Sequence, residues 1–314
     1  MLNRRHIRTK VMQSIYAMQQ QGNDNLQKQE KYLFYSIENC LDLHLLLLDI
    51  FIQLKEKEEL LLEANAKKHL ATPEDKDPNR KFVNNIVLNI LANQQNINKT
   101  IEINGVLNWR NNDDFILYIL KEIKETDLYQ AYMLGKTQTL ERDKTFLIDI
   151  YTEIIAPNER LYEYLEDTHL SWTDDFAMIN ALIVKELNNI SEKNQYYNFS
   201  TRVYKDIADK EYAQQLFRKT VLNDQALLEA FEHKTPNWDT ERIAEVDMIL
   251  IKMAIAELLY FPSIPTKVTI NEYVEIAKEY CTPNSSIFIN GVLDTLVKEY
   301  TQTGKIEKIG RGLL

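Results

Sequence analysis

The stretch from Ile264 to Tyr300 constrains the fold of this chain more than any other, because it predicts two helices with a break between them. Thr269 followed by Glu272 has the spacing of a capping box, which predicts the first turn of the first helix. Apolar residues then recur at helical intervals, at Ile270, Val274, Ala277 and Cys281. Pro283 cannot continue this helix and therefore ends it.

The second helix of this stretch is predicted to begin at Ser285 or Ser286, either of which can act as its N-cap. Its inner face is expected to hold Ile289, Val292, Leu293, Leu296 and Tyr300. Gly291 lies inside this helix, where glycine costs about 1 kcal/mol relative to alanine. We therefore expect a close helix crossing at Gly291.

The composition favours helices along the whole chain. Seven Gly and seven Pro in 314 residues are few, which argues against a β-sandwich or a Rossmann sheet. No apolar run is long enough for a membrane span, and the arginine-rich N-terminus does not resemble a secretory signal. Cys40 and Cys281 form neither a disulfide framework nor a metal-binding spacing. We expect an all-α, cytoplasmic protein.

The charge of the chain is unevenly distributed. The net charge is −10, yet the first 23 residues contain Arg4, Arg5, Arg8 and Lys10 and no acid, so this end carries +4 and the rest −14. A basic end on an acidic body attracts phosphate at one place. The alternative is a solvated helix end without a ligand. The first helix is predicted from Asn3 to Gln20.

Two segments in the middle of the chain resemble each other. Asp143–Asp175 can be laid over Asp209–Glu241 without a gap, so that Trp172 coincides with Trp238. Either a helical pair was duplicated or two amphipathic hairpins look alike, and the sequence leaves both open. We assign the second copy to the core because it leads directly into the apolar run Val246–Phe261.

Three blocks of sequence, in the same order, resemble the NusB family of transcription antitermination factors. They are RRHIRTKVMQSIYAMQQ near the N-terminus, VDMILIKMAIAELLYF from Val246, and IPTKVTINEYVEIAKEY followed by SSIFINGVLD. The resemblance covers residues 1–22 and 205–302. It implies a NusB-like helical bundle interrupted after its first helix by a long all-helical insertion, residues 23–204, and followed by a tail, 303–314.

The resemblance also implies which residues contact RNA. These are Arg4, Arg5, Arg8, Lys10 and Tyr16 of the first helix, and Asn284, Ser285 and Phe288 at the start of the last one. A helix N-terminus offers free N–H groups to phosphate oxygens, and an exposed Phe288 could stack on a base. The alternative for this corner is that Phe288 belongs to the core and the serines only cap the helix.

Asp247 and Lys252 are charges within the apolar run Val246–Phe261, where charged residues are rarely buried without a partner. We expect them on an exposed strip or at an interface. The resemblance implies that these positions face a small ribosomal protein, NusE. The alternative is an ion pair within the helix. Glu257, in the same helix, is interpreted as structural.

The function that the resemblance implies is transcription antitermination. The protein would bind the boxA element of nascent ribosomal RNA as a single strand, together with NusE, in an RNA polymerase antitermination complex. The five scattered histidines and the lack of a Gly-rich phosphate loop predict no catalytic site, no metal and no cofactor. The alternatives are a helical scaffold that has lost RNA binding and an accessory domain of an rRNA methyltransferase. A homodimer is left open.

Overall fold

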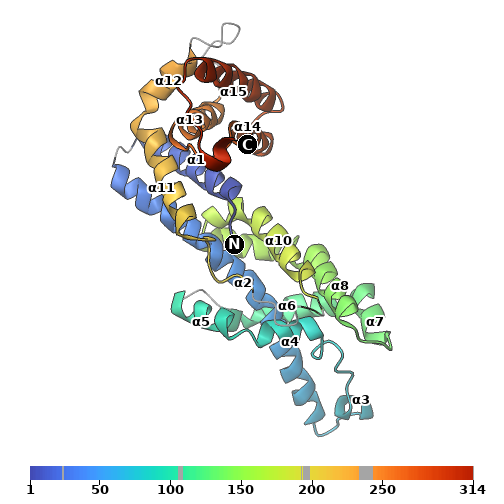
Figure 1. Ribbon diagram of the computed structural model, residues 1–314. Coiled ribbons are helices and arrows are strands. Elements are labelled where there is room, and N and C mark those ends of the chain that lie inside the picture. The colour runs from blue at the N-terminus through green and yellow to red at the C-terminus, as the bar shows by residue number, and fades with distance from the viewer. Residues whose placement is uncertain (23–24, 105–108, 192, 194–198, 233–242, 314) are drawn as a thin grey trace. The chain divides into compact units, whose positions relative to one another are not determined.

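The computed structural model describes residues 1–22, 25–104, 109–191, 193, 199–232 and 243–313 (Figure 1). Every regular element in these ranges is a helix, so the predicted all-helical fold class is confirmed. Within the same ranges, no helix is both long and apolar enough to cross a membrane.

The chain divides into two compact units. The first comprises Met1–Ile37 and Tyr204–Leu314, and the second comprises Glu38–Val203. This grouping does not test whether residues 23–204 were inserted into an older domain, so that division stays a prediction. The helices of the first unit are α1 (Arg4–Gln21), the start of α2 (Leu26–Ala66), α11 (Ile207–Leu222), α12 (Asp224–Glu232), α13 (Glu245–Tyr260), α14 (Thr266–Tyr280), α15 (Ser285–Gln302) and the short η5 (Gly310–Leu313).

The second unit contains the rest of α2 and a series of shorter helices. These are α3 (Pro73–Lys76), α4 (Ile86–Ala92), α5 (Gln95–Asn104), η1 (Trp109–Asn111), α6 (Asp113–Lys124), α7 (Asp127–Leu134), α8 (Leu140–Ile150), η2 (Tyr151–Ile155), α9 (Glu159–Thr168) and α10 (Ser171–Asn188). The run Cys40–Leu54 of α2 is buried almost throughout. It includes His44, whose Nε2 lies 2.7 Å from a carboxylate oxygen of Glu186. The imidazole and the carboxylate can be buried together because each is a hydrogen-bond partner of the other.

The first helix begins and ends as its sequence predicts. The Asn3 side chain accepts a hydrogen bond from the backbone N–H of His6 at 3.0 Å, which caps α1. Gly22 ends the helix in the left-handed conformation, with φ of 57°, which glycine adopts without a steric penalty.

The helix α13 forms the centre of the first unit. The helices α1, α11, α12, α14 and α15 all pack against it (Figure 1). A helix with neighbours on all sides must be apolar around its whole circumference, and every residue from Ile249 to Leu258 is buried. Lys252 and Glu257 lie in this run, so two charged side chains are held inside the bundle.

Three predictions about the end of the chain are wrong. Pro265 rather than Thr269 precedes the first turn of α14, because Thr269 and Glu272 bond to other helices instead of capping their own. No close helix crossing exists at Gly291, where an added Cβ would meet no atom within 4 Å. The predicted serine cap of α15 is also wrong: Asn284 occupies the N-cap position, and both serines lie within the helix.

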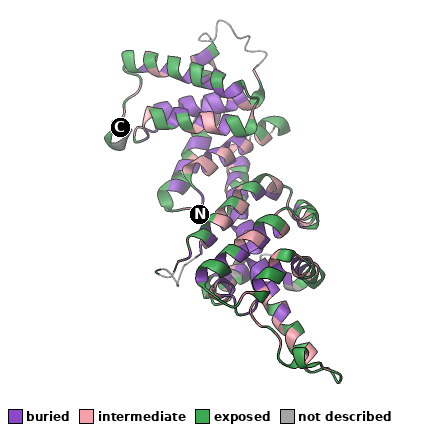
Figure 2. Ribbon diagram, turned by 90° about the vertical axis from the view of Figure 1, so that its right-hand side faces the viewer, coloured by how far each residue is buried: buried purple, intermediate pink, exposed green. Residues whose placement is uncertain are grey.

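The two similar segments occupy corresponding environments in different units. The aligned pairs Phe146/Tyr212, Tyr151/Phe217, Leu161/Leu227 and Leu165/Phe231 are buried in both copies. The view by burial shows helices with buried and exposed sides (Figure 2). The second copy, α11 and α12, packs against α13 as assigned, while Trp238 lies outside the described residues. Whether the segments were duplicated stays open.

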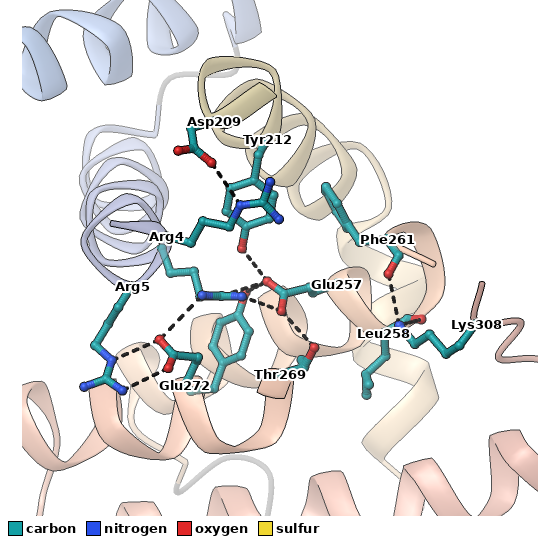
Figure 3. Close-up of polar contacts among 12 residues, drawn as sticks. Arg4, Arg5, Asp209, Tyr212, Glu257, Leu258, Phe261, Thr269, Glu272 and Lys308 are labelled. Carbon is teal, nitrogen blue, oxygen red and sulfur yellow. Dashed lines mark hydrogen bonds and ion pairs between the residues drawn. The ribbon is translucent and has the colours of Figure 1, made fainter. Parts of the chain in front are cut away.

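The C-terminal segment is packed onto the end of α13. The Nζ of Lys308 donates to the carbonyl oxygens of Leu258 and Phe261, each at 3.1 Å, and so supplies donors to a helix C-terminus (Figure 3). Gly312 lies so close to the turn after α13 that an added Cβ would be 2.0 Å from the carbonyl oxygen of Pro262. A side chain larger than that of glycine therefore does not fit at position 312, next to the hydrogen bond from the backbone N–H of Ile309 to the same carbonyl oxygen at 3.1 Å.

Replacement of Gly291 by alanine is expected to stabilise the first unit. The position is exposed, lies inside α15 and has room for a methyl group, so the gain is about 0.5–1 kcal/mol from helix propensity alone. A rise in the urea midpoint of the first unit checks this. The matched Gly312→Ala variant should lower that midpoint, and a fall for Gly291→Ala would contradict the open site.

Candidate nucleic-acid interface

A buried ion pair joins the first helix to the centre of the bundle. The guanidinium of Arg8 donates twice to the carboxylate of Glu257, from Nε and from Nη2, at 2.8 Å each. The side chains of Arg8 and Glu257 are 2% and 0% exposed. Removing two charges from water is costly, so this geometry must satisfy both groups fully.

The carboxylate of Glu257 accepts further hydrogen bonds from three side chains on two helices, α11 and α14. The hydroxyl of Tyr212 on α11 donates to it, Thr269 of α14 donates at 2.8 Å, and Tyr273 donates at 3.4 Å (Figure 3). Burial raises the pKa of the Tyr212 phenol well above its usual value, and the charge of Glu257 adds to the effect. The phenol therefore stays protonated as a donor.

The pKa of Arg8 shows which effect wins at this site. Burial on its own lowers it, but the fields of Tyr212 and Glu257 and the hydrogen bond to Glu257 raise it above its ordinary value. Arg8 thus remains charged inside the protein. The guanidinium also lies over the rings of Tyr212 and Tyr273, at 5.5 and 5.7 Å from their centroids.

Arg4 and Arg5 lie nearer the surface than Arg8. The Nε of Arg4 donates to Asp209 at 3.0 Å, and its guanidinium lies 4.8 Å from the centroid of the Tyr212 ring. Arg5 donates twice to Glu272, from Nε at 3.0 Å and from Nη2 at 2.9 Å. The side chains of Arg4 and Arg5 are 41% and 35% exposed, so solvent reaches both guanidinium groups.

The three arginines line an open hollow of about 630 Å³. Its other walls are the turn Ser263–Pro265, Val268 and Glu272. The hydrogen bond from Arg5, which outweighs the effect of burial, lowers the pKa of Glu272. Glu272 is therefore ionised at neutral pH. The hollow combines two accessible guanidinium groups with an apolar wall, an arrangement that can take a phosphate and the sugar or base next to it.

The structure places the other predicted RNA-binding residues unevenly. Tyr16 and Asn284 are exposed, whereas Lys10, Ser285 and Phe288 are buried. At the start of α15 the exposed apolar side chain is Ile287, which is 73% exposed. Sequence reasoning missed it, although its position off the predicted inner face of α15 was a usable signal. None of these placements tests a contact with RNA.

Asp247 and Lys252 of α13 are buried, whereas the sequence predicted them on an exposed strip or at an interface. The Nζ of Lys252 lies 2.7 Å from Asp224 at the start of α12, so the pair links neighbouring helices. Asp247 lies beside Cys281; burial, followed by the hydrogen bond to Asp247, raises the pKa of this thiol to about 12. Lys252 is paired with a carboxylate of another helix, whereas Asp247 has the Cys281 thiol beside it and keeps its Oδ1 buried without a hydrogen-bond partner.

The part of the chain that the structure describes holds no group of three or more His, Cys, Asp or Glu side chains that could bind a metal ion.

The fold and the site define a helical protein whose first helix presents arginines from a bundle built around α13. The NusB family matches residues 176–298, from α10 to α15. The transcription antitermination protein NusB of Salinibacter ruber is 40% identical over 109 residues, which are 35% of this chain and 68% of that protein. The chain belongs to the NusB family.

Two further relatives with the same name match over a similar stretch. The protein of Chloroherpeton thalassium is 39% identical over 112 residues, 36% of this chain and 53% of its own length. That of Natranaerobius thermophilus is 38% identical over 89 residues, 28% of this chain and 64% of its own length. The chain therefore spans about half to two thirds of these relatives. No solved structure matches it.

Replacement of Arg8 by alanine is expected to destabilise the first unit by about 3–5 kcal/mol, because it leaves the charge of Glu257 buried without its cation. Urea unfolding followed by circular dichroism measures the loss. The double variant Arg8→Met/Glu257→Gln should recover part of it. The control Arg4→Ala breaks a more exposed pair and should cost about 1 kcal/mol or less. Equal effects of the two alanine variants would contradict the buried pair.

Proposed function

We propose that this protein is a non-enzymatic transcription antitermination factor that binds single-stranded RNA through the hollow beside Arg4 and Arg5. The observation that carries the proposal is the pair of partly exposed guanidinium groups at the start of α1. Arginine neutralises backbone phosphates and also stacks on unpaired bases. The named relatives are transcription antitermination proteins, which supports the same role.

The RNA in this proposal is the boxA element of a nascent ribosomal RNA transcript, bound with ribosomal protein NusE in an RNA polymerase antitermination complex. Arg4 and Arg5 hold the phosphates, while Tyr16 and Asn284 contribute to the surface. A contact of Ser285 with RNA stays a prediction, which the burial of its side chain disfavours. Direct contacts of Arg8, Lys10 and Phe288 with RNA stay a prediction, which the burial of their side chains disfavours.

NusE is proposed to approach α13. Asp247 and Lys252 are buried, so their direct contact with NusE stays a prediction. Asp224, the ion-pair partner of Lys252, is about half exposed and extends this pair to the surface. We expect the pair of Lys252 and Asp224 to contact NusE through the exposed side of Asp224.

A second candidate function is a helical protein-interaction scaffold without RNA binding. The observation that favours it is the pairing of each of the three arginines with a carboxylate. Such pairing reduces the attraction of the site for phosphate.

Fluorescence anisotropy of a short boxA-type RNA, with and without NusE, separates the two functions. Wild type should bind selectively, and Arg4→Ala/Arg5→Ala should bind roughly tenfold more weakly, because each lost contact is a charged hydrogen bond. Two phosphate contacts predict a slope of log affinity against log salt of at most about −1.4 for a single strand, reached when no carboxylate compensates either arginine, and the double variant should lose it.

The matched control is Arg218→Ala/Lys298→Ala, which removes two positive charges from α11 and α15 outside the hollow. This control should retain most of the affinity. Equal, weak binding by wild type and both variants would favour the scaffold.

A further inference from the structure

The arginine site is electrically balanced in the free protein. Its three cations, Arg4, Arg5 and Arg8, face three carboxylates, those of Asp209, Glu272 and Glu257 respectively, at distances of 2.8–3.0 Å. The +4 charge of the N-terminal segment therefore does not act as +4 at this place, because three of its charges are compensated by residues from α11, α13 and α14.

The carboxylates occupy the donors that a phosphate would need. Glu272 accepts from both Nε and Nη2 of Arg5, the same fork of N–H groups that binds two phosphate oxygens. The Oε2 of Glu272, which accepts from Nε of Arg5, also lies 3.6 Å from Nη1 of Arg8. Asp209 accepts from one donor of Arg4, its Nε. A phosphate and these carboxylates thus compete for one set of donors.

We propose that Glu272 and Asp209 are internal competitors of RNA phosphate, so that binding exchanges two carboxylate–arginine pairs for phosphate–arginine pairs. The inference rests on the proposed function and adds to it how the site restrains its own affinity. A ligand can replace the carboxylates on both arginines only if it brings several phosphates together, as a nucleic acid strand does. A single phosphate group cannot replace both Asp209 and Glu272 as the partner of the two arginines.

The burial of the pairs separates those that can exchange from the one that cannot. The guanidinium groups of Arg4 and Arg5 are partly exposed and line the hollow together with Glu272, so water and a ligand reach them, whereas the side chain of Asp209 is only 10% exposed and lies outside this lining. Exposed ion pairs are weak because solvent screens them, and a phosphate can displace them at small cost. The pair of Arg8 with Glu257 is fully buried and fixed by three further donors, so it remains as the support of the site.

The test compares Glu272→Gln with wild type, using two probes: the boxA-type RNA and inorganic tripolyphosphate. Glutamine keeps the size and one acceptor of glutamate but removes its charge. We expect both probes to bind about two- to fivefold more tightly at low salt, the range of an exposed ion pair. We also expect the salt slope for RNA to become steeper by about 0.7, because Arg5 then contributes a full charge.

Asp209→Asn is the second variant and should shift both probes in the same direction through Arg4. The matched control is Glu275→Gln, which removes the same charge from α14 one turn further along. Glu275 bonds to Lys278 instead of to an arginine, so its loss should change affinity less than the loss of Glu272. Circular dichroism and the melting temperature confirm that each variant is folded.

Failure of the inference differs from failure of the proposed function. Weaker binding of both probes by Glu272→Gln, or a change no larger than that of Glu275→Gln, would overturn the inference and make Glu272 a support for Arg5. Tighter binding of tripolyphosphate by Glu272→Gln, with no RNA binding by any form of the protein, would support competition between Glu272 and phosphate for Arg5. The same result would refute the RNA function.

Discussion

The first unit depends on one buried interaction, the pair between Arg8 and Glu257. Because neither charge can remain in a dry interior alone, the pair requires donors and rings from α11 and α14 to surround it. Tyr212, Thr269 and Tyr273 meet this requirement. The relative placement of four helices thus follows from satisfying one carboxylate.

The same helix carries arginines with two different roles. Arg8 faces inward and holds α1 onto the bundle, whereas Arg4 and Arg5 border the hollow and keep part of their surface in solvent. Burial, which the residue type does not reveal, decides between these roles. The hollow therefore has a rigid inner wall and an outer edge whose ion pairs are weak enough to be exchanged.

Much of the fold could be predicted from local signals, since the ends of α1, the buried part of α2 and the apolar run of α13 follow from spacing, capping and composition. The wrong start of α14 has a tertiary cause. Thr269 and Glu272 match a capping box locally, but their side chains bond to Glu257 and Arg5 on other helices. No local pattern could show that Arg8 is buried, because its partner lies 249 positions away.

The separation of Arg8 and Glu257 in the sequence also determines the order in which parts of the protein can fold during synthesis. At the usual pace of a ribosome, roughly 12–50 s pass between the synthesis of Arg8 and that of Glu257. The contiguous unit Glu38–Val203 emerges completely within that interval and can fold as it appears. During this interval α1 lacks the helices that bury Ile7, Val11 and Ile15 in the folded protein. We expect the nascent chain to need a chaperone at this stage, and the arginine site to be the last part assembled.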